Sequence, residues 1–168
     1  MPPNEPARLA ALHDLEILDT APEDLYDDVV KLAAAICETP IALINFVDAD
    51  RQWGKALIGL DSSEATRDAS FCARTIVAQD DVLIVEDTLA DPVWAASAQV
   101  VGAPHLRFYA AAAIRTEAGH AVGTVCVADR SARTISDDQI EALRALARQT
   151  SANLRLRRES KRLVEADA

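Results

Sequence analysis

Reactive and hydrogen-bonding side chains gather in three short stretches of this chain. They are Arg67-Asp68-Ala69-Ser70-Phe71-Cys72-Ala73, then Arg107-Phe108-Tyr109-Ala110, then Gly123-Thr124-Val125-Cys126-Val127-Ala128-Asp129. An arginine beside a helix N-terminus can hold a carboxylate or a phosphate together with free backbone N–H groups. A thiol in such a place has a lowered pKa and can act as a nucleophile. The stretches therefore indicate a pocket that binds a small molecule, a site that reacts through a thiol, or a densely packed interior.

The arginine and the thiols also have purely structural interpretations. Arg67 and Asp68 can pin a surface loop to each other. Free cysteines are mostly small buried hydrophobes, and no histidine lies near Cys72 in the sequence. We therefore expect Cys37, Cys72 and Cys126 to be reduced core residues, with nucleophilic chemistry as the alternative for Cys72.

Aromatic and acidic residues complete the candidate site. Trp94, Arg107 and Tyr109 lie where the segment 59–105 returns to the strands, and an aromatic wall with a hydroxyl is typical of a ligand pocket. Plain packing is the alternative. Asp87 is a candidate acceptor, although turn and cap roles are common for aspartate. The candidate ligand-binding residues are Trp53, Arg67, Asp68, Phe71, Cys72, Asp87, Trp94, Arg107, Tyr109 and Thr124.

Composition limits the classes of function. The net charge is −10 and the hydrophobic fraction is 50%. Acidic residues dominate the first hundred positions, which argues against nucleic-acid binding, and a basic excess lies at 155–162. No apolar run approaches the roughly 20 residues of a membrane span, and the N-terminus has no signal-peptide pattern. We therefore expect a cytoplasmic protein without a membrane partner.

Enzyme motifs are missing from the sequence. There is no Gly-rich phosphate loop, no GxSxG, no HExxH and no CxxC. The cysteines are too widely spaced for a metal site. We therefore predict no catalytic residues, no metal and no cofactor.

Hydrophobic periodicity predicts alternating helices and strands in an α+β order. A capping box at Thr20-Ala21-Pro22-Glu23 is expected to open the second helix and Thr39-Pro40 to end it. Another capping box at Ser136 is expected to open the last helix. The other expected helices cover 7–18, 70–78 and 93–101, and the expected strands cover 41–47, 51–58, 82–85, 106–114 and 121–128.

Apolar stripes predict how the two long helices pack. In the second helix the expected buried face is Leu25, Val29, Leu32, Ala33 and Ile36. In the last helix a seam spaced by three and four residues is suited to a parallel partner helix. That seam consists of Ile140, Leu143, Ala147, Thr150 and Leu154.

The two hairpins predict a central antiparallel sheet of five or six strands with helices on both faces. Terminal helices are expected to cover one face, and the excursion 59–105 the other, with a cavity beneath it. Residues 1–6 are expected to be a flexible N-terminus and 7–158 a single domain. The long helix at 136–165 is expected to serve dimerisation and signalling.

Over residues 8–158 the chain resembles a GAF domain of the type found before histidine kinases and diguanylate cyclases. Besides the three stretches above, the resemblance rests on Leu15–Glu23, Pro40–Leu43, Val47–Trp53 and Val85–Asp87. It implies a GAF/PAS-like fold, a ligand cavity under the excursion, a homodimer through the terminal helices, and a kinase or cyclase as output protein. It also implies signalling rather than catalysis. Small residues at 110–113, where relatives carry bulkier ones, would enlarge the cavity or let a helix approach closely.

Subfamily motifs narrow what the resemblance implies. The NKxnFxxxDE pattern of cyclic-nucleotide-binding members is missing, and Cys72 is followed by Ala73 rather than by the histidine typical of bilin attachment. His105 is the available haem ligand, and nothing else in the sequence supports haem. The leading hypothesis is a non-enzymatic sensory domain that binds a small molecule in bacterial-type signal transduction. Two alternatives stay open: a redox enzyme of the free-methionine sulfoxide reductase type, and a ligand-free interaction or dimerisation module.

Overall fold

The computed structural model describes residues 2–62 and 64–167 of the chain, and within them six strands form one antiparallel sheet. The strand order is β3-β2-β1-β6-β5-β4. Both predicted hairpins, β1–β2 and β5–β6, are confirmed. The strands are β1 (Ile41–Val47), β2 (Arg51–Ile58), β3 (Ala65–Thr66), β4 (Val82–Val85), β5 (Phe108–Arg115) and β6 (Ala121–Asp129).

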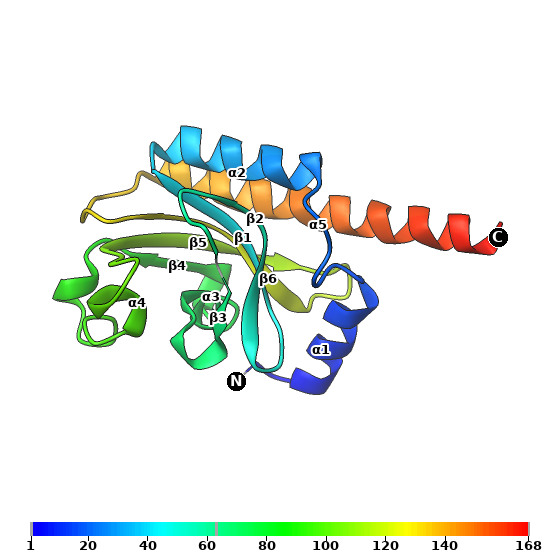
Figure 1. Cartoon of the computed structure of the whole chain (residues 1–168), viewed down its shortest axis with the longest axis horizontal. Helices are drawn as coiled ribbons and strands as arrows, with labels where there is room; N and C mark the ends of the chain where they lie inside the picture. The colour runs from blue at the N-terminus through cyan, green and yellow to red at the C-terminus, as the bar shows by residue number, and fades with distance from the viewer. Residues whose placement is uncertain (1, 63, 168) are drawn as a thin grey trace.

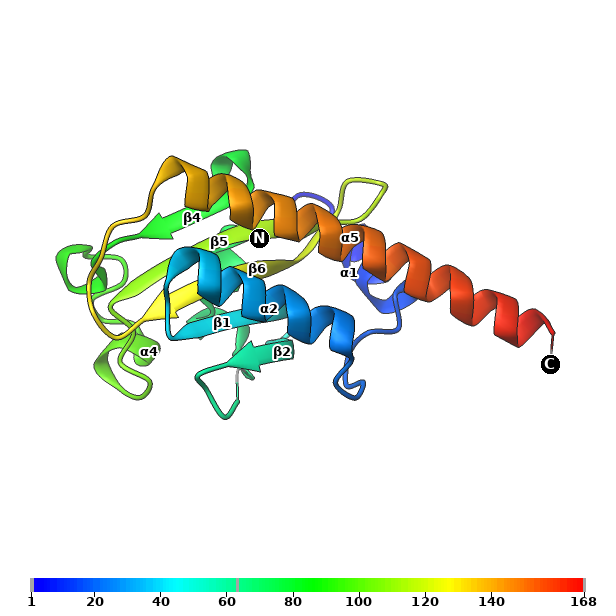
Figure 2. The same ribbon diagram turned by 90° about the horizontal axis from the view of Figure 1, so that it is seen from above.

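The described residues contain five α-helices, which cover both faces of the sheet as predicted. The helices α2 and α5 lie side by side over one face, and the excursion with α3 and α4 covers the other (Figures 1 and 2). The helices are α1 (Glu5–Asp14), α2 (Asp24–Cys37), α3 (Phe71–Thr75), α4 (Ala98–Val101) and α5 (Asp137–Ala166). The expected α+β fold with a long C-terminal helix is confirmed.

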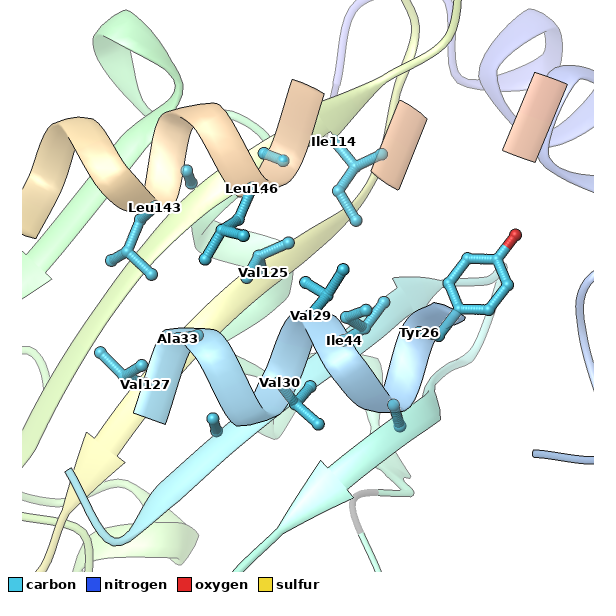
Figure 3. Packing of buried hydrophobic residues seen from close by; sticks show 14 of the residues in the cluster. Tyr26, Val29, Val30, Ala33, Ile44, Ile114, Val125, Val127, Leu143 and Leu146 are labelled. Carbon is cyan, nitrogen blue, oxygen red and sulfur yellow. The ribbon is translucent and has the colours of Figure 1, made fainter. Parts of the chain in front are cut away.

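Each face of the sheet contributes to its own hydrophobic core. Beneath α2 and α5, Ile44, Ile114 and Val125 pack against Leu143 and other helix residues (Figure 3). Beneath the excursion, a second cluster joins the outer face of β1, β5 and β6 to α3. Because side chains alternate along a strand, β5 supplies both clusters. Tyr109, Ala111 and Ala113 face the excursion, whereas Ala110, Ala112 and Ile114 face the helices.

The buried face of α2 differs from the predicted one. Val29 and Ala33 are buried as expected, but Leu25, Leu32 and Ile36 are exposed. The buried positions are Tyr26, Val29, Val30, Ala33 and Cys37. Each exposed residue has an apolar neighbour at the next position, so two stripes at helical spacing compete in this sequence. Packing against α5 and the sheet selects the stripe that begins at Tyr26.

The predicted capping boxes have different outcomes. At Ser136 the box is confirmed, because the Ser136 hydroxyl accepts from the Gln139 N–H and the Gln139 side chain accepts from the Ser136 N–H. At Thr20–Glu23 the prediction is wrong: α2 begins at Asp24, and the Glu23 side chain makes no cap hydrogen bond to the described residues. Instead, the buried ammonium of Lys55 donates to the Thr20 hydroxyl and to the Glu23 carboxylate.

Other helix bounds shift by a few residues. The first helix begins at Glu5 rather than at residue 7, so residues 5 and 6 belong to a helix instead of the segment 1–6 that was expected to be flexible. The Ser70 cap is confirmed, because its hydroxyl accepts from the Ala73 N–H, but α3 ends at Thr75. Of the helix expected over 93–101, only α4 forms as an α-helix.

The seam predicted on α5 for a partner helix is occupied within the chain. Leu143, Ala147, Thr150 and Leu154 are buried in the domain's own structure, so the prediction of an intermolecular seam there is wrong. The C-terminal end of α5 extends past the body of the domain (Figure 1). Its basic residues pair with the acidic segment 14–23 through Arg157–Glu23, Arg158–Glu16 and Arg162–Asp14.

Candidate functional site

Three aromatic rings fill the space between the excursion and the sheet. Phe71, the first residue of α3, stacks on Trp94 with ring centroids 4.1 Å apart and an interplanar angle of 9°. The Phe71 ring also packs against Tyr109 on β5, with ring centroids 4.8 Å apart. All three side chains are buried. Stacked aromatic pairs of this kind stabilise beyond their area of burial, so the region expected to be a cavity is packed by the chain's own side chains.

A buried polar cluster lies beside the rings, centred on Cys72. Its sulfur lies 3.1 Å from Thr124 Oγ1, 3.3 Å from Asn45 Nδ2 and 3.4 Å from the Tyr109 hydroxyl. Asn45 and Thr124 are cross-strand partners on β1 and β6. Cys126 lies two residues beyond Thr124 on the same face of β6, with its sulfur 4.0 Å from Asn45 Nδ2.

The hydrogen bonds around Cys72 favour its ionised form. The Cys126 thiol, followed by Thr124, Tyr109 and Asn45, lowers the pKa of Cys72 to about 6 against the opposing effect of burial. The same contact with Cys72, together with burial, raises the pKa of Cys126 well above its ordinary value. Burial and the nearby sulfurs raise the pKa of Tyr109. Of the two thiols, Cys72 is therefore the more readily ionised.

Arg67 is held away from this interior. Its guanidinium pairs with Glu5 of α1 at 2.5 Å and donates to the Asp48 carbonyl at 3.2 Å. Asp68 is exposed, so the alternative in which Arg67 and Asp68 pin the loop to each other is replaced by a link between the loop and the N-terminal helix. Both residues line an open surface pocket of about 470 Å³.

The remaining predicted site residues are dispersed. Trp53 packs with the cluster beneath the helices, across the sheet from the excursion. Asp87 accepts from the Leu89 N–H and pairs with Arg107 at 3.0 Å, which is the turn and cap role weighed above. The structure therefore brings together Phe71, Cys72, Trp94, Tyr109 and Thr124, and separates from them Trp53, Arg67, Asp68, Asp87 and Arg107.

Sequence reasoning missed Asn45 and Thr75 as members of the cluster. The Thr75 hydroxyl donates to the Phe71 carbonyl and lies 3.2 Å from the Tyr109 hydroxyl. Asn45 is the only polar residue in the apolar run 41–47. A lone amide in a strand that is buried on both faces needs buried partners, and that signal could have identified it.

The sheet order, the excursion and the long last helix define a sensory-type fold of the α+β class. The family model described as GAF domain matches residues 21–154, and the chain belongs to this family. A curated relative is the cyclic di-GMP phosphodiesterase PA2567 of Pseudomonas aeruginosa, 34% identical over 154 residues. The alignment covers 91% of this chain and 26% of that protein, so the chain spans about a quarter of its length.

Solved structures share the fold at low identity. The GAF domain of a phosphoenolpyruvate-protein phosphotransferase from Coxiella burnetii superposes with a TM-score of 0.68 at 12% identity, covering 95% of this chain and 99% of that one. The GAF domain of a putative sensor histidine kinase from Pseudomonas syringae gives 0.57 at 23%, covering 97% and 94%. A type II free methionine-R-sulfoxide reductase from Thermoplasma acidophilum gives 0.58 at 15%, covering 79% and 96%. Within the described residues, the structure contains no helix with the length and apolarity needed to span a membrane.

Proposed function

We propose that this GAF domain is a non-enzymatic regulatory module of bacterial-type signal transduction in the cytoplasm, in which α5 carries a signal from the excursion to an output protein. One observation carries the proposal: β5 is shared by both cores. Its residues alternate between the excursion side, with Tyr109, and the helix side, with Ile114. Because close-packed interiors transmit small displacements, a shift beneath the excursion must be accommodated by the layer that contains α5.

The input we propose is a small molecule that binds between the excursion and the sheet. Phe71, Trp94, Tyr109, Cys72 and Thr124 would line that site. Since the Trp94 ring packs on Phe71, a ligand has to displace Trp94 and take over its stacking contact. A flat, partly apolar compound with a group able to accept from Thr124 or Tyr109 fits these requirements.

Ligand screening combined with hydrogen–deuterium exchange tests this proposal. Mass spectrometry of the freshly purified protein, native and denatured, identifies any bound molecule. A true input protects amides of 70–76 and 94–109 and also changes exchange within 143–154. Protection confined to the excursion would contradict transmission through β5.

A ligand-free interaction module is the second candidate function, and the filled interior favours it. The buried stack of Phe71, Trp94 and Tyr109 completes a core without any bound molecule. Under this alternative no compound protects the excursion, while the domain still associates with a partner protein. The same exchange experiment therefore separates the two candidates.

The output and the oligomeric state belong to the proposal as well. The relative's name points to cyclic di-GMP signalling. We propose a kinase, a cyclase or a phosphodiesterase as the output protein. The proposal does not include phosphodiesterase activity for this chain, which spans about a quarter of the relative's length. With the α5 seam occupied, a homodimer would use the exposed side chains Leu25, Leu32 and Ile36 of α2 together with Leu156, Leu163 and Val164 of α5. These apolar residues lie on neighbouring helices (Figure 2).

A further inference from the structure

Two of the three cysteines belong to one buried hydrogen-bond network, and the third does not. The sulfurs of Cys72 and Cys126 both lie near the Asn45 amide nitrogen, at 3.3 and 4.0 Å. Cys37 ends α2 and lies in the core on the opposite side of the sheet. All three are free thiols and all three are buried. Burial alone therefore does not distinguish the three thiols. They differ in their hydrogen-bonding neighbours, because only Cys72 and Cys126 lie near Asn45.

The environment of Cys72 differs from that of a thiol used only for packing. Thr124 and Asn45 each direct a donor at its sulfur, and the Tyr109 hydroxyl lies at a distance from which it can do the same. Converging donors stabilise a thiolate, which is the nucleophilic form of cysteine. The lowered pKa of Cys72 and the raised pKa of Cys126 agree with this geometry. The pair thus combines a nucleophilic sulfur with a protonated neighbour.

Asn45 adds a feature that packing does not explain. Its buried Oδ1 has no hydrogen-bond partner among the described residues, although such groups are nearly always satisfied. A half-turn of the amide would direct Oδ1 toward the sulfurs, where it can accept from a protonated thiol. The two amide orientations therefore suit two different states of the thiol pair.

We propose that Cys72 and Cys126 form an oxidation site. A small hydroperoxide is the oxidant, and the product is a reversible intramolecular disulfide between these two cysteines. The Cys72 thiolate attacks the outer oxygen of the hydroperoxide, so that an S–O bond forms, the O–O bond breaks, and hydroxide leaves from hydrogen peroxide or an alkoxide from an organic hydroperoxide. Cys126 then attacks the Cys72 sulfenic acid; the S–S bond forms, the S–O bond breaks, and water leaves with the Cys126 proton. An external dithiol restores both thiols by exchange.

The position of the pair gives the disulfide a structural consequence. Cys72 belongs to α3 in the excursion and Cys126 to β6 in the sheet, so the bond ties the two layers together. Any effect of this tie on output rests on the proposed regulatory function. Formation of the bond is independent of that function, and so is its test.

The primary experiment uses the unmodified chain and treats Cys37 as the internal control. The reduced protein is exposed to hydrogen peroxide, then denatured, alkylated and mapped by mass spectrometry. Before alkylation, the intact mass should fall by two hydrogens. After alkylation, we expect a peptide pair joining residues 72 and 126 and an alkylated Cys37, and a dithiol should fully reverse the bridge. Cys72 should be consumed at least about 10-fold faster than Cys37. Because the sulfurs are buried, a bulky maleimide should label neither of them in the native protein.

Single substitutions assign the two roles. Cys126→Ser should prevent the bridge and leave Cys72 with one or more added oxygens, whereas Cys72→Ser should leave Cys126 unoxidised. Cys37→Ser should behave like the parent chain.

Four results with the unmodified chain would each overturn the proposal. They are equal and slow oxidation of all three thiols, a bridge that involves Cys37, a bridge only between chains, and addition of oxygen to Cys72 without a bridge. Because these results come from the unmodified chain, the test does not depend on whether any variant folds.

Discussion

Removal of the Glu5 carboxylate should destabilise the domain far more than its position near the N-terminus suggests. Glu5 accepts two hydrogen bonds from Arg8, at 2.8 and 2.9 Å, and pairs with Arg67. The Arg8 side chain is only 1% exposed and also donates to the Val47 carbonyl at the end of β1. Glu5→Ala leaves this buried cation without its carboxylate. Breaking a buried pair from one side costs about 3–5 kcal/mol, and since Glu5 is 15% exposed we expect about 3 kcal/mol.

Urea denaturation followed by circular dichroism measures this effect, and Asp14→Ala in the same helix is the matched control. Asp14 pairs with Arg162 at a similar distance, 3.0 Å, but is 58% exposed. An exposed pair contributes about 0–1 kcal/mol. If the two variants lose equal stability, the reasoning that Arg8 depends on Glu5 is wrong.

The pH dependence supplies an independent check on Glu5. Hydrogen bonds from Arg8, and then from Arg67, lower the pKa of Glu5 from 4.5 to about 2. A folded-state pKa below the unfolded one means that the stabilisation is complete above about pH 4.5 and is lost as the pH falls toward 2. The gap in unfolding free energy between the parent chain and Glu5→Gln should therefore shrink over this window. A gap that stays constant from pH 6 to pH 3 would contradict the assignment.

Two further variants test the packing, and a third, with its own control, tests the proposed dimer surface. Gly123→Ala should yield insoluble protein or lose more than about 3 kcal/mol, because a Cβ there would lie 2.2 Å from the Asn45 carbonyl oxygen; expression and denaturation report it. Phe71→Ala should lower the unfolding free energy by about 3–5 kcal/mol, since two ring contacts disappear, and a change below about 1 kcal/mol would mean that the stack is not formed. Leu32→Glu should abolish any dimer seen by sedimentation, whereas Leu89→Glu in the exposed excursion should not; equal effects would place the dimer elsewhere.

Much of the fold is predictable from the sequence, because local signals and the global pattern agree. The apolar run 41–47, the turn 48–50 and the strand 51–58 predict the β1–β2 hairpin, which is confirmed. Ser136 and Gln139 specify the start of α5 through a reciprocal cap. Such signals act within a few residues and need no knowledge of distant partners.

The errors arise where a residue's partner is distant in sequence. Thr20–Glu23 has the letters of a capping box, but Lys55, more than thirty residues away, takes both the hydroxyl and the carboxylate. The α5 seam has the spacing of a coiled coil, which is also the spacing of a helix packed on a sheet. The candidate site divides for the same reason. Phe71 and Tyr109 are distant in sequence but meet on the excursion side of the sheet, whereas the carboxylate that pairs with Arg67 comes from α1.

The alanines at 110–113 connect the site to the helix that we propose as the signal carrier. Their small side chains were expected either to enlarge a cavity or to let a helix approach. The structure shows the second, and on both faces of β5: Ala110 and Ala112 lie beneath the α2–α5 layer, while Ala111 faces the excursion cluster that contains Phe71. An alanine side chain has no alternative rotamers, so it cannot adjust its position when a neighbouring residue moves. Under the proposed function we therefore expect a change at Tyr109, or at Cys72 that contacts it, to displace β5, and α5 packs directly on that strand.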